Sequence, residues 1–523
     1  MNTITDKNRS RAFAQTRRYA CCLLLTLVCF AANSSANQID FDAPAYGAET
    51  DADADDLRTD DPVEPAKIVL IKSQEDMNDN WNKSGFWNPK ETPETVTNAI
   101  FVVGGGLRVR TCNSVEEQTF GGENSNNSLY IGYEADAKTL STGILHLKGN
   151  CLDDDTITID NLVVGNGEIF QGAANANVTL NGKLTINNYC LLRIKAEATT
   201  KTEKRSLILN SVIYGNGDLV LRSDDDLPGH VSLMNMSSGD NPFTGSITIA
   251  PNTRVTLSGE DAFINASSFT NNGVLALAAD QTLNNLSGSG TIDVGEHTLT
   301  MNNDRLCQIT GAIGGEHSLL IKTGDGTLQI VNQAKGAVRA ESFVISSGSL
   351  DMEGYFTGTL KVVNDTIEIE EATTFSPGVS LGAIDIDGDF ILADGAVLLM
   401  EIGGKTFDLN DQLILNGQVT FEEGAIVQFA LSDDSTYAPV VGDMIAVNMP
   451  KVNWTAVTFS SSDFSLSYYD DKEGLQYIKA EANNPTKRIP TKGVAAVPEP
   501  STWALMALGV VVLFLRKRVR NLK

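Results

Sequence analysis

Short runs in which apolar and polar residues alternate dominate the chain from Lys67 to about residue 370. Early examples are Ile68–Ile71, Asn98–Val103 and Leu107–Arg110. An alternation of period two places every second side chain on the same face of a strand. Because glycine and asparagine separate the runs, and no amphipathic helical pattern of normal length occurs, we expect an all-β chain without crossover helices.

Pairs of glycines recur at the turns between these runs. Gly165-Asn-Gly167, Gly215-Asn-Gly217 and Gly288-Ser-Gly290 each follow a short apolar run and begin another. Glycine allows a positive φ at corners where a Cβ atom would clash, and the uneven spacing of the copies predicts loops of varied length. A right-handed parallel β-helix, a solenoid of stacked coils of roughly 20 residues, accounts for this pattern. We assign residues 67–370 to it.

Aromatic and asparagine side chains stand where such a solenoid needs closing. Trp81, Phe86 and Trp87 lie between the first two runs, and we expect them to cap the end of the core, with stacking on sugar as the alternative. The asparagines of Leu283–Leu286 and Met301–Asn303 are suited to ladders at the turns of the stack.

The apolar runs become larger between residues 371 and 483. Phe390–Leu392, Ala396–Ile402 and Ala425–Phe429 are examples. We interpret this region as terminal coils that lead into a β-sandwich-like cap, because the open end of a solenoid exposes unpaired strand edges.

The N-terminal part differs in composition from this body. Residues 1–36 combine a positively charged start, the apolar run Tyr19–Ala32 and the small residues Ser34-Ser35-Ala36, which predicts a signal peptide cleaved after Ala36. Residues 37–66 carry ten acidic residues against Arg58 alone. Such a segment buries too little apolar surface to order itself, so we expect an acidic, disordered leader.

The C-terminal part has three components in a fixed order. A polar linker, residues 484–496, precedes Val497, Pro498, Glu499 and Pro500. The run Trp503–Leu515, which includes Gly509, contains no charge, and as a helix it would span roughly 20 Å, short for a permanent membrane anchor. A basic cluster then favours a cytoplasmic position for the end of the chain. Its members are Arg516, Lys517, Arg518 and Arg520.

This arrangement closely resembles the PEP-CTERM sorting signal of Gram-negative bacteria, a tail also called the ice-binding protein C-terminal domain. The resemblance covers residues 497–523 and implies a single short transmembrane helix, export across the inner membrane and recognition of Pro498, Glu499 and Pro500 by an exosortase. Delivery to the cell surface or to extracellular polymer would follow. The alternative is an ordinary tail anchor. The tail occurs on unrelated cargoes, so it indicates an address and leaves the activity open.

A second resemblance lies inside the solenoid region. Leu319–Ile330 contains Lys-x-Gly-x-Gly-Thr-Leu, and Phe343–Leu350 follows it with Gly-Ser-Leu, a pattern similar to the autotransporter-associated β-strand repeat. Phe375–Ser380 and Asp411–Leu415 are also typical of the closing part of such proteins. The resemblance implies a passenger-type β-helix displayed outside the cell. It does not imply an autotransporter, which would need a C-terminal membrane barrel.

The charge of the chain restricts its partners. The formal net charge is −27, and it becomes −31 when residues 1–36, with five basic and one acidic residue, are removed. An acidic surface of this kind repels nucleic acid and anionic lipid, so we exclude both. Export also makes disulfides permissible, but the sequence does not specify how the remaining cysteines would pair. These are Cys112, Cys151, Cys190 and Cys307.

Some β-helices are polysaccharide lyases or glycoside hydrolases, so we considered catalysis. Arg193-Ile-Lys195, Asp224–Asp226 and Gly229-His230 resemble fragments of a polygalacturonase site, but they occur in the wrong order, and we interpret them as exposed turn residues. No Gly-x-Ser-x-Gly elbow occurs. His146, His230, His297 and His317 are far apart and form no metal-binding motif. We therefore predict no catalytic residues, no metal and no cofactor.

Ice binding would require ranks of Thr-x-Thr repeated once per coil. Thr95/Thr97, Thr156/Thr158 and Thr298/Thr300 are isolated pairs, which argues against it. The remaining hypothesis is an exported structural or adhesin-like protein without catalysis of its own, with extracellular polysaccharide as the candidate partner besides exosortase and the inner membrane. The alternative is a β-helix polysaccharide lyase or glycoside hydrolase. Two or three carboxylates that converge on one face of the solenoid would favour the enzyme.

Overall fold

The computed structural model describes residues 65–481 in part. The description omits residues 77–78, 114, 116, 123–124, 149–153, 173–176, 195–205, 224–231, 238, 240, 364–371, 434, 439, 449–457, 461–464 and 471–475. The predicted signal peptide, the acidic leader up to residue 64, the linker and the C-terminal tail all lie outside the described residues.

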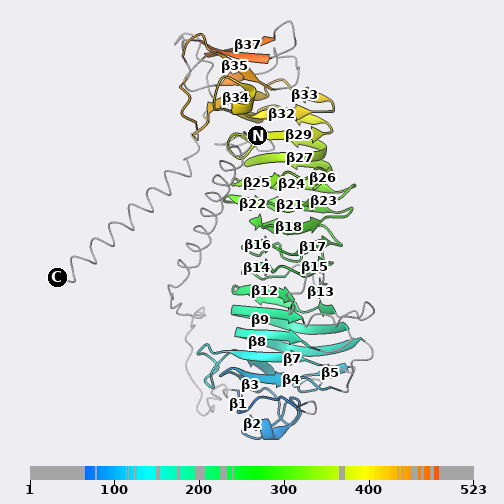
Figure 1. Ribbon diagram of the computed structural model, residues 1–523. Coiled ribbons are helices and arrows are strands. Elements are labelled where there is room, and N and C mark those ends of the chain that lie inside the picture. The colour runs from blue at the N-terminus through cyan, green and yellow to red at the C-terminus, as the bar shows by residue number, and fades with distance from the viewer. Residues whose placement is uncertain are drawn as a thin grey trace, which may run out of the picture. The chain divides into compact units, whose positions relative to one another are not determined.

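The described chain is almost entirely β-structure, and nearly all its strands pair in parallel with a strand of the next coil (Figure 1). The offset between paired residues varies with the coil. Phe269 pairs with Leu286, 17 residues later, whereas Leu107 pairs with Gly143, 36 residues later. This arrangement is a β-solenoid with corner loops of unequal length, as the glycine spacing predicted. Its right-handed sense of winding stays a prediction.

The strands form ladders that run along the stack. The first comprises β4 (Leu107–Arg110), β7 (Gly143–Leu147), β8 (Asp155–Gln171), β9 (Asn177–Ile194), β12 (Asp218–Ser223), β14 (Ser246–Ile249), β16 (Ser268–Asn271) and β19 (Leu286–Ser287). It continues through β22 (Cys307–Ile309), β25 (Thr327–Asn332), β27 (Ser349–Val362), β28 (Thr374–Ser376), β31 (Val397–Ile402), β34 (Ile426–Leu431) and β36 (Thr458–Ser460).

A second ladder passes through β8, β9 and β27 as well, because these long strands bend around corners. Its other members are β5 (Glu117–Thr119), β10 (Ser206–Leu209), β13 (Ser232–Met236), β15 (Thr253–Leu257), β17 (Val274–Leu277), β20 (Thr291–Asp293), β23 (Ile313–Gly314), β26 (Val338–Ile345), β29 (Ala383–Asp387) and β32 (Gln412–Leu415).

Two further ladders complete the coils. One joins β1 (Lys67–Leu70), β3 (Ile100–Val103), β6 (Ser128–Ile131), the middle of β8 and β9, and β11 (Val212–Gly215). The other joins β18 (Gln281–Asn284), β21 (Thr298–Asn302), β24 (Leu319–Thr323), the ends of β26 and β27, β30 (Phe390–Leu392) and β33 (Val419–Phe421).

Aliphatic side chains fill the interior of the stack in columns. Because side chains alternate along a strand, each strand contributes every second residue to the core. One column of paired residues in the first ladder is fully buried, and burying each of these side chains contributes roughly 1.5–3 kcal/mol. Its members are Val109, Leu145, Ile169, Leu192, Leu221 and Ile249.

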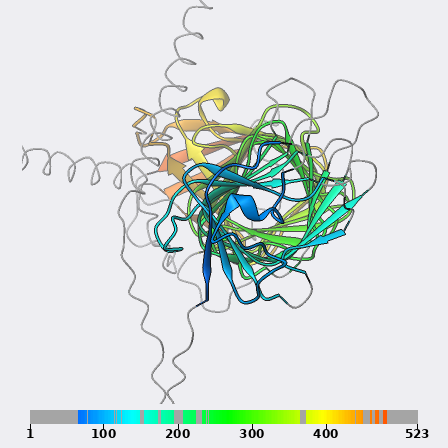
Figure 2. The same ribbon diagram turned by 90° about the horizontal axis from the view of Figure 1, so that it is seen from below.

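The N-terminal end of the core is closed by aromatic side chains, as predicted. Trp81 and Trp87 are 1% and 0% exposed, and the Trp87 indole N–H donates to the Trp81 carbonyl over 2.8 Å. Edge-to-face contacts join Trp87 to Phe101 and Trp81 to Phe120, with ring centroids 5.0 and 5.1 Å apart. Viewed along the stack, the short 3₁₀ turn η1 (Ser84–Phe86) crosses this end, beside β2 (Trp87–Asn88) (Figure 2).

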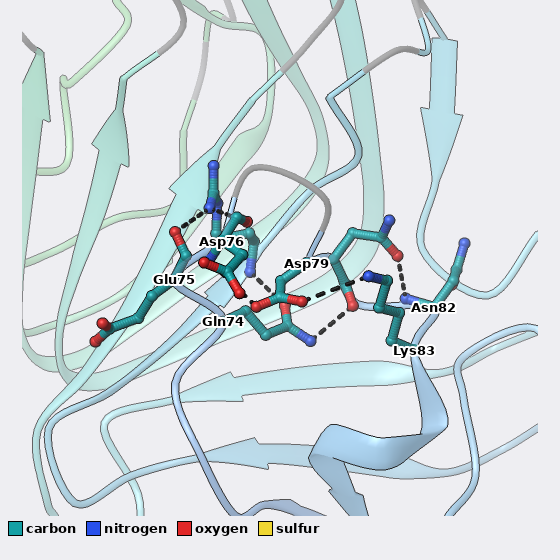
Figure 3. A network of polar contacts seen from close by, with 8 residues as sticks. Gln74, Glu75, Asp76, Asp79, Asn82 and Lys83 are labelled. Carbon is teal, nitrogen blue, oxygen red and sulfur yellow. Dashed lines mark hydrogen bonds and ion pairs between the residues drawn. The ribbon is translucent and has the colours of Figure 1, made fainter.

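A polar network ties this cap to the first coil (Figure 3). Gln74 accepts a hydrogen bond from the Arg110 backbone N–H at 2.9 Å and donates one to the Asn80 carbonyl at 2.7 Å. The Arg110 guanidinium donates to the carbonyl oxygens of Glu75 and Asp76. Asp79 accepts from the Asp76 N–H and the Lys83 ammonium. The cap is therefore bonded to β4 as well as packed against the core.

Parallel coils continue beyond residue 371 through β28, β31 and β34. The 3₁₀ turn η2 (Phe407–Leu409) interrupts them once. Three strands then form a separate antiparallel sheet in the order β35 (Met444–Val447), β38 (Gln476–Glu481) and β37 (Ser465–Asp470). The domain limits assigned from the sequence stay predictions.

Candidate functional site

The residues singled out at the two termini cannot be placed. Ala36, Val497, Pro498, Glu499 and Pro500 lie outside the described residues. So do the apolar run with Trp503, Gly509 and Leu515, and the basic cluster Arg516, Lys517, Arg518 and Arg520. Within the described part of the chain, no helix is long and apolar enough to cross a membrane. The structure describes the surface of the solenoid and its corners.

Outward-facing amides and hydroxyls connect successive coils by hydrogen bonds. Asn210 donates to the Asn181 side chain at 3.0 Å, and Ser237 donates to Asn210 at 2.9 Å. Asn302 donates to Asn284 at 2.8 Å, which confirms the predicted turn ladder. A polar side chain that is hydrogen-bonded to the coils on either side stabilises the stack, because each such bond contributes about 0.5–1.5 kcal/mol to the free energy of unfolding.

A lysine occupies an inward position at one corner. Lys322 is paired with Met301 and Ile345, both buried, and is itself 0% exposed. Its ammonium donates to the carbonyl oxygens of Thr323 and Gly324, each at 2.8 Å, and of Ser347 at 3.2 Å. Burial lowers its pKa to about 8. The lysine of the Lys-x-Gly-x-Gly-Thr-Leu stretch therefore braces the turn that its glycines form.

Two carboxyls of the later coils, Asp411 and Asp351, have raised pKa values. Asp411 is 1% exposed and accepts the backbone N–H groups of Gly382 at 2.9 Å and Glu401 at 2.7 Å. Burial, followed by the charges of Glu401 and Asp351, raises its pKa to about 8. Burial also raises the pKa of Asp351 to about 6, although Gln329 and Ser349 donate to it at 3.3 Å each.

The sequence analysis did not single out Asp351 or Asp411 as candidate acids. Raised carboxyl pKa values are typical of acid catalysts as well as of buried structural acids. Asp411 uses both oxygens to hold the backbone of two strands, which favours a structural role. Its position just before β32, at a corner, was visible in the sequence. One of its two hydrogen-bond donors, the Gly382 N–H, belongs to the preceding coil, which the sequence does not reveal.

Of the fragments that resemble a polygalacturonase site, the structure describes only Arg193 and Ile194. Arg193 lies in β9, forms an ion pair with Glu168 at 2.5 Å and stacks over the ring of Phe170, with 3.9 Å between guanidinium carbon and ring centroid. The interpretation of Arg193 as an exposed turn residue was wrong, because it is a half-buried strand residue. Lys195, Asp224–Asp226 and Gly229-His230 lie outside the described residues.

The histidines have different surroundings. His146 is 7% exposed and stacks on Phe170 at 4.7 Å, and burial, assisted by nearby Lys148 and Arg110, lowers its pKa to about 2. His297 lies 3.7 Å from Asp280, and His317 lies 3.7 Å from Glu341. In the part of the chain that the structure describes, no group of three His, Cys, Asp or Glu side chains could hold a metal ion.

Three of the four cysteines expected in the exported protein are described, and each carries a free thiol. Cys190 and Cys307 are buried and Cys112 is partly exposed. Burial raises the pKa of Cys190 to about 12, so its thiol is neutral and unreactive. Cys151 lies outside the described residues.

The comparisons with known proteins bear on the C-terminal tail. Residues 496–518 match the PEP-CTERM protein-sorting motif. This PEP-CTERM match agrees with the sequence analysis and implies an exported protein that an exosortase processes at the membrane. No curated protein matches the chain. The similarity of Leu319–Leu350 to the autotransporter-associated repeat stays a resemblance.

Proposed function

We propose that the chain is a structural, adhesin-like protein of the cell surface or extracellular matrix, exported and sorted through its PEP-CTERM signal and without catalysis of its own. The observation that carries the proposal is how the outward polar side chains are used. Asn181, Asn210 and Ser237 bond to one another from coil to coil, as do Asn284 and Asn302. These groups stabilise a stack instead of converging on a reacting centre.

Other features support the same proposal. Thr156 and Thr158 pair with Thr179 and Asn181 in the next coil, so no rank of Thr-x-Thr repeats there, which disfavours ice binding. The net charge of −27 suits a soluble exported protein and disfavours nucleic acid as a partner.

The location test uses the producing cells with and without exosortase. We expect a mature form that ends near Pro500 and lies outside the inner membrane only when exosortase is present. A protein that keeps Lys523 and stays in the inner membrane in both strains would contradict the sorting part of the proposal and favour a plain tail anchor.

A glycan-cleaving enzyme is the second candidate, favoured by the raised pKa values of the Asp351 and Asp411 carboxyls. Incubation of the exported protein with alginate and pectin, followed by measurement of new reducing ends and unsaturated products, separates the two. We expect no product. Product formation that is lost in Asp351→Asn, with Asp433→Asn as an exposed control, would overturn the non-catalytic assignment.

A further inference from the structure

One outward face of the solenoid carries an apolar and aromatic cluster instead of the usual polar residues. It lies on the ladder of β6, β8, β9 and β11. Tyr130 pairs with Val163, Val163 with Thr185, and Thr185 with Tyr214. Adjacent strands are about 4.8 Å apart, so the backbones of Tyr130 and Tyr214 are separated by about 14 Å. We name this surface, with Tyr133, Leu140, Lys183 and Val212, the tyrosine face.

A loop from the corner after β6 covers one end of this face. Tyr133 and Leu140 form a bridge across the loop, and the Tyr133 ring lies 5.4 Å from that of Tyr130. The Tyr133 hydroxyl accepts a hydrogen bond from Asn187 at 2.8 Å. A Cβ atom on Gly165 would lie 2.6 Å from the Tyr133 ring, so only glycine lets the ring approach the sheet this closely. Val163, which points outward, is consequently only 6% exposed.

The other end of the tyrosine face is open to solvent. Val212 is 38% and Tyr214 37% exposed. The Lys183 ammonium lies 4.6 Å from the centroid of the Tyr214 ring, and Lys183 is itself exposed. The Lys183 ammonium lies over one face of the Tyr214 ring, so a sugar would stack on the other face, with the cation close by.

The polar groups around the rings indicate the chemistry of a partner. Thr185, Asn161 and Asn187 supply hydroxyl and amide groups on the same face, and Asn161 is held by a 2.6 Å bond to Ser128. A pyranose ring presents C–H groups on its face and hydroxyls at its rim. It is therefore complementary to an aromatic ring that is surrounded by hydroxyl and amide groups. A peptide strand would need a free strand edge, but β6, β8 and β9 are each paired on both edges. On β11, which pairs with β9, the Ile213 N–H donates to the Asn241 side chain and the Gly215 carbonyl accepts from the Thr244 N–H.

We propose that the tyrosine face binds the pyranose rings of an extracellular polysaccharide, with Tyr214 as the stacking platform and Lys183 favouring a chain that carries carboxylates. Although the chain as a whole is acidic, the exposed Lys183 ammonium supplies a local counter-charge for a carboxylate on this face. The inference rests on the proposed function as an extracellular structural protein and identifies its partner class.

The test measures binding of the exported protein to alginate oligosaccharides and to neutral cello-oligosaccharides by calorimetry. We expect alginate to bind more tightly than the neutral chain. Tyr214→Ala should weaken binding by about tenfold or more, as expected for an aromatic contact residue, and Lys183→Met should remove the preference for alginate. Tyr355→Ala, which alters a partly exposed strand tyrosine in β27, is the matched control and should bind as the wild type does.

Thermal unfolding of each variant checks that the fold is intact, and Tyr214→Phe, which keeps the ring, should retain binding. The proposal is overturned when neither oligosaccharide binds the wild type, or when Tyr214→Ala binds as tightly as Tyr355→Ala. Release of cleaved products in the same samples would instead contradict the proposed non-catalytic function, so the two failures are distinguishable.

Discussion

Gly348 leaves the space that the ammonium of Lys322 occupies: a Cβ atom on Gly348 would lie 2.9 Å from Nζ of Lys322 and 2.3 Å from the Gly324 carbonyl oxygen. Gly348 also has a φ of +69°, a conformation that other residues seldom adopt. The two residues belong to successive coils, so the lysine of one coil and the glycine of the next depend on each other.

Replacing Gly348 by alanine should therefore destabilise the solenoid. Both the positive φ and the backbone contacts oppose a methyl group, and we expect a loss of about 1–3 kcal/mol in the free energy of unfolding. Chemical denaturation measures it. Gly336→Ala is the control, because Gly336 also has a positive φ, +77°, but a Cβ atom there meets nothing within 4 Å. Equal losses in both variants would show that strain alone matters.

Replacing Lys322 by methionine should also destabilise the fold, although methionine is apolar and of similar length. The change leaves the carbonyl oxygens of Thr323, Gly324 and Ser347 without the ammonium, and unpaired buried acceptors cost about 1–3 kcal/mol each, partly offset by removal of a buried charge. We expect a net loss of roughly 2–4 kcal/mol. Lys335→Met, at an exposed position, should be neutral. A Lys322→Met variant as stable as Lys335→Met would refute the bracing role.

The Asp411 corner predicts how stability depends on pH. The folded-state pKa of about 8 lies above the unfolded value of about 4, so the folded state binds the extra proton between these pH values. Asp411 therefore contributes stability that is fully present below about pH 4 and is lost as the pH rises through 8. Urea denaturation at pH 5 and pH 9 measures the loss. We expect a smaller pH dependence in Asp411→Asn and an unchanged one in Asp433→Asn.

Replacing Trp87 by alanine should open the N-terminal end of the core. The indole is fully buried, packs against Phe101 and bonds to the Trp81 carbonyl, so we expect a loss of about 3–5 kcal/mol. Hydrogen exchange followed by mass spectrometry would locate the effect in β1 and β3 first, because coils contact only their neighbours. Uniform loss of protection along the whole stack would argue against a local cap.

Much of the fold could be predicted because it follows from short-range rules. Alternation specified the strands, the glycine pairs specified the corners, and Asn284 and Asn302 formed the expected ladder. The inward position of Lys322 could not be predicted from alternation. In Leu319-Leu-Ile-Lys322, either set of alternate residues could face inward, and only the pairing with Met301 and Ile345 decides it.

The tyrosine face and the Asp411 corner escaped prediction for a related reason. Tyr133 reaches the face from a loop and is positioned by Gly165 and Asn187, which lie in later coils. The pKa of Asp411 is raised by burial and then by the charges of Glu401 in β31 and Asp351 in β27. Both depend on which coils lie side by side, and the uneven loop lengths hide that register in the sequence. The terminal sorting motif was recognised because it is contiguous.

The parallel ladders also determine how the molecule would respond to force. The hydrogen bonds between coils run along the axis of the stack. Tension applied between the two ends would therefore act along these bonds and break them one after another. We expect coils to peel away singly at low force, starting from the end that is pulled. A protein held at one end and attached to polymer along its side would then lengthen stepwise under strain, so that it could absorb mechanical work before its attachment fails.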